Sequence, residues 1–382
     1  NLIKTKKTKG KTMKNIMKIA FVMLSSFALL SSANAGEVSV TGTAKATYKI
    51  ESSDSTTGKN GAGKAIGIAN ELAFNASGEL DNGFTWKWQV ESDPDAGATS
   101  PFQNDDSRFE VTTPYGVIAA YVSEGSLSAK YKSSQAVYTV GSDHGNTAGI
   151  LYGTNISSYN NLQYHTPAGL LPYGIAFKAG YTPGGVASQE AASSNAGGTV
   201  NDDSAGFEEY QVTATPIDGL NIAASYGAKQ TVRLVTGSVN NDYEQGGYNV
   251  NYTYGGATIG YGKMYLAPTG ALVDYGTDAA ITTDATSGVK YFENTMMGIS
   301  YAVNDALSVS YESERSEAEK RDLNINNVTY ADVSVEMDIT TIQAAYVMGG
   351  MTLSVSLKDI ENADYLKDKD EKETIFAVAM AF

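Results

Sequence analysis

Apolar and polar residues alternate with a period of two through most of the chain, and this pattern predicts β-strands. In the first clear run, residues 38–51, apolar or small side chains fill the even positions and polar side chains fill the odd ones. Successive side chains of a strand point to opposite faces, so each such run has one apolar and one polar face. The pattern recurs at residues 84–91, 173–181, 220–226, 248–254, 307–312 and 352–357. The first run exceeds the ~9–11 residues with which a tilted strand crosses a membrane.

The last ten residues, Glu373–Phe382, show the same alternation and end on an aromatic residue. Phe376, Val378, Met380 and Phe382 share one face, and alanines occupy most of the other. In a soluble protein such a terminal strand would be an exposed edge prone to aggregation. In a membrane barrel it pairs with the first strand and closes the sheet, so this stretch favours a barrel.

The predicted connections are alternately short and long. The short turns are rich in Gly, Asn, Asp and Pro, which suit hairpins. They fall at 81–83, 114–116, 167–172, 218–219, 255–256, 304–305 and 349–350. Long polar stretches fall at 52–63, 93–105, 142–157, 183–206, 230–242, 268–288, 315–331 and 364–370.

These fifteen connections predict an all-β fold: a transmembrane antiparallel up-and-down β-barrel of sixteen strands, with short periplasmic turns and long extracellular loops. Residues 117–141 are too long for one strand, and two further turns there would give eighteen strands instead.

The N-terminus reads as a signal peptide. Lys14 and Lys18 precede the apolar stretch 19–30, and Ala33-Asn34-Ala35 fits a cleavage site. The apolar stretch is too short to span a bilayer as a helix. We therefore expect residues 1–35 to be an N-terminal extension plus signal peptide that is removed, and 36–382 to form the barrel; an uncleaved N-terminal anchor is the alternative.

Charge and cysteine content narrow the functional classes. The full chain has 27 basic and 42 acidic residues, and removal of the seven lysines in 1–35 leaves a formal net charge of −22. This balance argues against nucleic acid as a partner, because phosphates need a basic surface. The acidic balance is instead compatible with cationic partners, or with divalent ions that bridge the protein to anionic lipid head groups. The absence of cysteine excludes disulfides, zinc thiolate sites and cysteine nucleophiles.

The whole predicted mature chain resembles the general porins of Gram-negative bacteria, the trimeric sixteen-stranded family. The resemblance rests on the signal peptide ending at Ala35, the opening strand Val38–Ala44, the rhythm of turns and loops, and the closing strand ending in Phe382. It implies a homotrimer in the outer membrane that lets small hydrophilic solutes diffuse passively. It also implies that Phe376 and Phe382 form the signal read by the outer-membrane assembly machinery.

In this family the third long loop folds into the barrel and opposes basic residues of the wall. The resemblance makes 142–157 the candidate constriction loop, carrying Asp143 and His144. The wall candidates lie on the polar faces of the first strands: Lys45, Lys49, Lys87 and Arg108. The loop departs from the family in having one acidic residue and no Pro-Glu-Phe-Gly type of sequence.

Other motifs are better explained structurally. Gly58–Ala65 nearly matches a phosphate-binding loop but lacks its final Ser or Thr and lies between strands. Asp143-His144 could suggest a hydrolase triad, but no serine motif accompanies it. The charged runs 312–322 and 364–373 are interpreted as solvated loops.

We expect no cofactor. Acidic pairs such as Asp105-Asp106 and Asp202-Asp203 could bind divalent cations weakly, and bridging to lipopolysaccharide is a hypothesis. His165 is expected to have a structural role, whereas His144 could tune the loop's charge with pH.

The sequence thus favours a non-enzymatic outer-membrane porin for small hydrophilic solutes and ions, with a mild preference for cations because of its acidic balance. Two alternatives stay open. A substrate-selective channel would be indicated by aromatic residues lining the lumen, and a structural or adhesin barrel by a plugged lumen.

Overall fold

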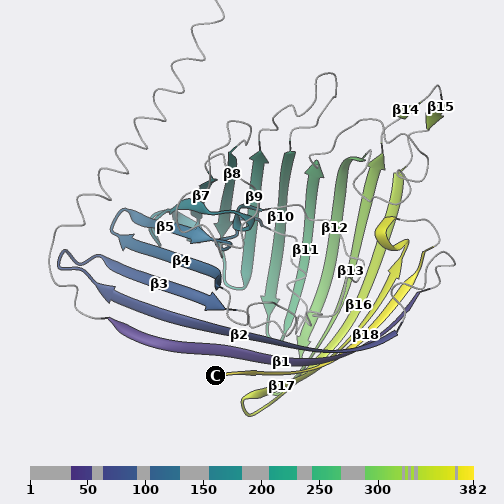
Figure 1. The fold of residues 1–382 in the computed structure, drawn as a ribbon, viewed down its shortest axis with the longest axis horizontal. Helices are drawn as coiled ribbons and strands as arrows, with labels where there is room; N and C mark the ends of the chain where they lie inside the picture. Colours follow the sequence, from purple (N-terminus) through teal and green to yellow (C-terminus); the bar gives the residue numbers. More distant parts are fainter. Residues whose placement is uncertain are drawn as a thin grey trace, which may run out of the picture.

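The computed structural model describes residues 36–53, 63–92, 104–129, 155–182, 206–229, 243–267, 289–320, 323–325, 328–330, 334–365 and 369–382. Sixteen antiparallel strands form a closed barrel (Figure 1), which confirms the predicted strand number over the eighteen-strand alternative. The wall strands are β1 (Glu37–Ser53), β2 (Gly63–Glu79), β3 (Thr85–Ser92), β4 (Asn104–Thr113), β5 (Gly116–Val122), β6 (Asn161–His165), β7 (Ala176–Thr182), β8 (Phe207–Ala214), β9 (Leu220–Lys229), β10 (Tyr243–Tyr254), β11 (Ala257–Ala267), β12 (Val289–Ala302), β13 (Leu307–Lys320), β16 (Ser334–Met348), β17 (Met351–Glu361) and β18 (Glu371–Ala381).

The first and last strands close the barrel as the terminal alternation predicts. β1 pairs with β18 from Thr43 opposite Ala381 to Ser53 opposite Glu371. The ladder reaches the last residue, because the Gly42 amide donates to the Phe382 carbonyl at 2.9 Å and the Phe382 amide donates to the Gly42 carbonyl at 3.0 Å. This pairing leaves neither strand with an exposed edge along its paired length.

All seven short turns lie where the sequence predicts them, and several use glycine at positive φ. Gly83, Gly219, Gly255 and Gly349 have φ between 59° and 78°, a region that costs glycine little. The eight longer connections therefore meet at the other rim, since consecutive strands run in opposite directions.

A small hairpin and three short helical turns complete the described elements. The hairpin pairs β14 (Leu323–Ile325) with β15 (Val328–Tyr330) as a separate sheet, outside the barrel wall (Figure 1). The turns are η2 (Ile156–Ser158), η3 (Pro172–Gly174) and η4 (Ala363–Tyr365). In the described part of the chain, no helix has the length and apolar character needed to cross a membrane.

The two faces of the wall differ as the alternation predicts. Outward-facing residues of β1 and β18 are exposed and mostly large and apolar, including Val38, Tyr48, Phe376 and Phe382. Inward-facing positions are polar or small over much of the wall; buried examples are Thr47, Gln163, Asn249, Asn294 and Ser316. An apolar outer face and a polar inner face are typical of a barrel in a membrane with a water-filled bore.

Of the two charged runs expected to be solvated loops, the first lies mostly in the wall and the second has only its end there. Residues 312–320 belong to β13, where Glu312 is buried and faces inward. Glu371 and Glu373 belong to β18 and are also buried. The loop interpretation was wrong because alternating charges on a strand retain the period of two without an apolar face to reveal it.

An apolar cluster lies inside the barrel towards the rim of long connections. Its wall residues face inward near strand ends at that rim, and further members come from the connections after β5 and after β17. The members are Leu127, Ile156, Phe207, Tyr243, Leu266, Phe292, Ala318, Met337, Ile339, Ile360, Ala363 and Tyr365. Four aromatic residues of the cluster, Phe207, Tyr243, Phe292 and Tyr365, therefore lie inside the barrel at this rim.

Candidate functional site: the inward segment and the inner wall

The connection between β5 and β6, the third long one, begins inside the barrel directly after Val122. Residues 123–129 leave the wall and follow its inner face towards β9. Gln211 of β8 donates to the Leu127 carbonyl at 2.9 Å, and the Ala129 amide donates to the Ser225 hydroxyl of β9 at 2.6 Å. The segment therefore passes the inner faces of β6, β7 and β8. We call residues 123–129 the inward segment.

A glycine on β7 makes room for this path. A Cβ added to Gly180 would lie 2.6 Å from Cδ1 of Ile156 and 3.0 Å from Cδ1 of Leu127. Any larger residue at this position would displace both side chains, which belong to the apolar cluster. The wall is thus shaped to accept the inward segment.

Polar side chains on the wall hold both ends of the connection. Asn161 of β6 donates from Nδ2 to the carbonyls of Glu124 and Ile156, at 3.0 and 3.2 Å. The buried Glu209 carboxylate of β8 accepts the Ile156 amide at 2.8 Å and the Gln245 amide group at 3.1 Å. These bonds satisfy backbone groups that have no strand partner.

A compact charged group joins the inward segment to β4. Arg108 Nη1 lies 3.2 Å from Glu124 Oε1, and the Tyr121 hydroxyl donates to Glu110 Oε1 at 2.7 Å. Burial raises the pKa of the Glu124 carboxyl; the Arg108 charge opposes that shift and the Glu110 charge adds to it. An arginine on the wall thus faces a carboxylate on the inward segment.

The predicted wall residues differ in their surroundings. Arg108 meets Glu124, and Lys87 is exposed on the inner face directly opposite Glu110 in the strand register. Lys45 lies on the inner face of β1 and is half-buried. Lys49 is buried between Glu51 and Glu373, so its charge is neutralised locally.

Other predicted residues lie outside this group. Asp143 and His144 lie outside the described residues, as does 142–154 of the expected constriction loop, so that assignment stays a prediction. His165 lies on the inner wall, 2.8 Å from Gln163 Oε1 and stacked on Tyr121 at 6.4 Å between ring centroids. Among the described residues, no group of three or more acidic or histidine side chains could hold a metal ion.

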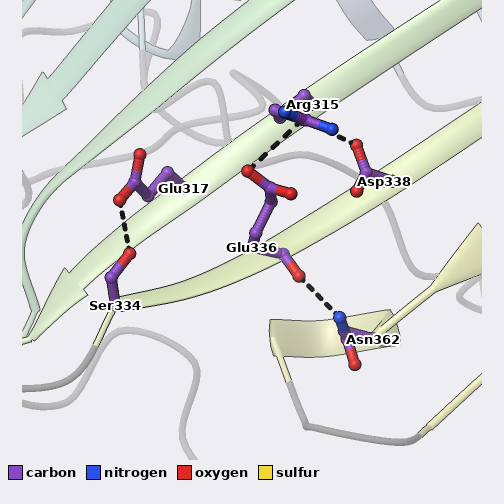
Figure 2. A network of polar contacts seen from close by, with 6 residues as sticks. All are labelled: Arg315, Glu317, Ser334, Glu336, Asp338 and Asn362. Carbon is purple, nitrogen blue, oxygen red and sulfur yellow. Dashed lines mark hydrogen bonds and ion pairs between the residues drawn. The ribbon is translucent and has the colours of Figure 1, made fainter.

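The outer face also carries charge near the rim of long connections (Figure 2). Arg315 of β13 lies 3.3 Å from Glu336 and 3.0 Å from Asp338 on β16, and Ser334 donates to Glu317 at 2.5 Å. These exposed contacts occur where the apolar outer residues of β13 and β16 end. They indicate that this part of the wall lies beyond the hydrocarbon layer, because charged side chains that face the lipid tails are costly.

Sequence reasoning missed Glu110, Tyr121, Glu124 and Gln163 as members of the site. Glu110 shares its strand face with Arg108, so the period-two pattern contained a signal for it. Glu124 lies in the stretch 117–141, where a turn belonged only to the eighteen-strand alternative, and no local pattern marks residues 123–129 as leaving the wall.

A closed barrel with an apolar exterior, a polar interior and a segment folded along its inner wall defines a transmembrane β-barrel channel. The chain belongs to the Gram-negative porin family, whose model matches residues 20–335. It is an outer-membrane protein that forms a channel for passive diffusion.

Solved structures show the same fold at low sequence identity. OmpF of Salmonella typhi, in a complex with daunomycin, is 13% identical with a TM-score of 0.59, covering 91% of this chain and 98% of that one. An anion-selective porin from Comamonas acidovorans is 13% identical with a TM-score of 0.59, and the match covers 91% of this chain and 100% of that one. The outer membrane protein OmpT of Vibrio cholerae, in its trimer form, is 14% identical with a TM-score of 0.58. The match covers 91% of this chain and 100% of that one. No match was found among curated protein sequences.

Proposed function

We propose that the inward segment and the adjoining inner wall of β3, β4 and β7 form the constriction of this channel. The ion pair between Arg108 and Glu124 carries the proposal, because it joins the wall to a segment that runs inside the barrel from β5 to β9. Lys87 and Lys178 add positive charge on the same inner wall, and Glu110 adds negative charge. Transport here needs no covalent chemistry.

Positive and negative charges nearly balance at this constriction, so the charge of the channel mouth should determine the ion selectivity. Acidic residues exceed basic ones by 22 in the predicted mature chain, and many lie in the long connections at one rim. An acidic mouth concentrates cations and repels anions. We therefore propose a mild preference for cations, with the pair at Arg108 and Glu124 as a local modifier.

The inner aromatic residues support a general pore over a substrate-selective one. Phe207 and Phe292 face inward, yet both are almost fully buried in the apolar cluster. A solute in the bore cannot stack on rings that are covered. In the part of the chain that the structure describes, these two rings thus anchor connections and do not belong to a binding track.

The proposed assembly is a homotrimer in contact with outer-membrane lipid and lipopolysaccharide. A trimer form is known for the Vibrio cholerae OmpT relative. The exposed aromatic side chains of Phe376 and Phe382 on the closing strand are the proposed signal for the assembly machinery.

Planar-bilayer recordings of the refolded chain test the proposal. We expect large ohmic steps that close in thirds, and a reversal potential shifted towards cations under a salt gradient. Arg108→Gln should increase the cation preference and Glu124→Gln should decrease it. A folded barrel without conductance would refute the channel; conductance with unchanged selectivity in both variants would refute the constriction.

A further inference from the structure

The described residues of the connection between β17 and β18, the eighth long one, also lie inside the barrel. The sequence pattern predicts a solvated loop here, but Ala363 and Tyr365 of η4 are buried, with 0% and 2% of their surface exposed. Both belong to the apolar cluster inside the wall. We refer to η4 with its flanking residues 362 and 369–370 as the second inward element.

Tyr365 attaches this element to the inner wall of β12 and β13. Its ring lies 5.1 Å from the ring of Phe292, and its hydroxyl is 2.6 Å from the Ser316 hydroxyl. Ser316 in turn donates to Asn294 Oδ1 at 2.5 Å. A buried tyrosine whose ring is packed and whose hydroxyl is bonded is held in one position.

Asn362 fixes the start of the element against β16. Its Nδ2 donates to the Glu336 carbonyl at 2.9 Å, as Figure 2 shows, and its amide donates to Asp370 Oδ1 at 3.2 Å. Asn362 and Tyr365 have φ of 53° and 57°, a left-handed conformation that reverses the chain. The Ala363 amide closes the turn on the Lys369 carbonyl at 2.7 Å.

An ionic network lies on the other side of the element. On the inner wall of β18, Glu371 pairs with Lys369 at 3.0 Å, and Glu373 pairs with Lys49 of β1 and Lys358 of β17. The element is therefore attached through apolar packing towards β12–β16 and through ion pairs towards β18. It lies on a different side of the barrel from the first inward segment, which follows β5–β9.

We propose that the second inward element is a fixed part of the channel that narrows its mouth and sets the upper size of the solutes admitted. The inference deepens the proposed function, because it names a second determinant of solute selection in the same channel. Its physical basis is that the contacts of Tyr365 and Asn362 hold this element inside the bore, where it occupies space that solutes would otherwise use.

The first experiment measures placement without requiring conductance. The native chain has no cysteine, so Ala363→Cys gives one thiol. This thiol should react slowly with a small hydrophilic thiol reagent, while the thiol of Asp305→Cys, in an exposed turn, reacts fast. Adding Tyr365→Ala to the Ala363→Cys variant should raise its reaction rate by about 10- to 100-fold, since loss of a buried ring favours local opening. Equal rates for the two single-cysteine variants would overturn the placement.

The second experiment measures the channel. Tyr365→Ala should shift the size limit for neutral polymers upwards and raise the single-channel conductance, whereas Tyr254→Ala, at an exposed site on the outer face, should change neither. If Tyr365→Ala does not yield a heat-modifiable folded barrel, Asn362→Gly is the milder variant, because glycine accepts φ of 53°. Unchanged conductance and size limit in a folded variant would overturn the inference, whereas a native chain without conductance would instead refute the proposed function.

Discussion

Lys49 is a predicted charge of the pore wall, but its surroundings in the structure point to a role in stability instead. Its Nζ lies 2.6 Å from Glu51 and 3.0 Å from Glu373, and the lysine side chain is only 4% exposed. The contact with Glu373 joins β1 to β18, so the lysine bridges the seam at which the barrel closes. We predict that Lys49→Met destabilises the barrel strongly.

The magnitude follows from the carboxylates that the substitution leaves behind. Removing one partner of a buried ion pair costs about 3–5 kcal/mol, because the remaining charge stays buried without compensation. Lys358 lies 3.6 Å from Glu373 and still compensates that carboxylate in part, while Glu51 loses its lysine. The lower end, roughly 3 kcal/mol, is therefore expected.

Equilibrium unfolding in urea, followed by the fluorescence of the two tryptophans in β3, measures this loss. Lys372→Met is the matched control, since Lys372 also joins β18 to a neighbouring strand but lies on the outer face. It is 68% exposed in its 3.0 Å pair with Asp359, and an exposed pair contributes about 0–1 kcal/mol. Glu51→Gln combined with Lys49→Met should recover part of the stability. If Lys49→Met costs no more than Lys372→Met, the reasoning fails.

Two further predictions concern the inward segment and the closing strand. Because burial raises the pKa of Glu124, this carboxylate should be neutralised at a higher pH than an exposed carboxylate, while Arg108 stays charged. The reversal potential should therefore shift towards anions as the pH falls. Glu124→Gln should lack this step, and an identical pH profile in the variant would contradict the prediction. Gly42→Leu should prevent or weaken closure, because its Cβ would lie 2.6 Å from Cζ of Phe382 and 2.8 Å from the Glu71 carbonyl oxygen. We expect a loss of about 1–3 kcal/mol in urea unfolding, whereas Ala44→Leu on the same outer face should be tolerated; equal stability of the two variants would count against the contact.

The wall of the barrel could be predicted from the sequence because its determinants are local. Alternation assigns each side chain to a face, and Gly, Asn and Asp place the turns, as at Gly83 and Gly349. These signals act over a few residues, so strand number, the two faces and the closing strand all followed from them. Arg108 and Lys87 lie on the inner wall for the same reason, while their role at a constriction stays a prediction.

The contents of the barrel were decided by contacts between residues distant in the sequence. Residue 129 meets residue 225, and Tyr365 meets Ser316, with no local pattern that announces either contact. Alternation stops being informative where the chain leaves the wall at Ser123, and it says nothing about which inward charges become neighbours. The sequence by itself determined the barrel and its polarity, because each strand signal is short-range. Only the closed sheet decided that Lys49 is neutralised at the seam and that Glu124 faces Arg108. It also decided that the described parts of two connections lie inside, because closure brings distant strands together around them.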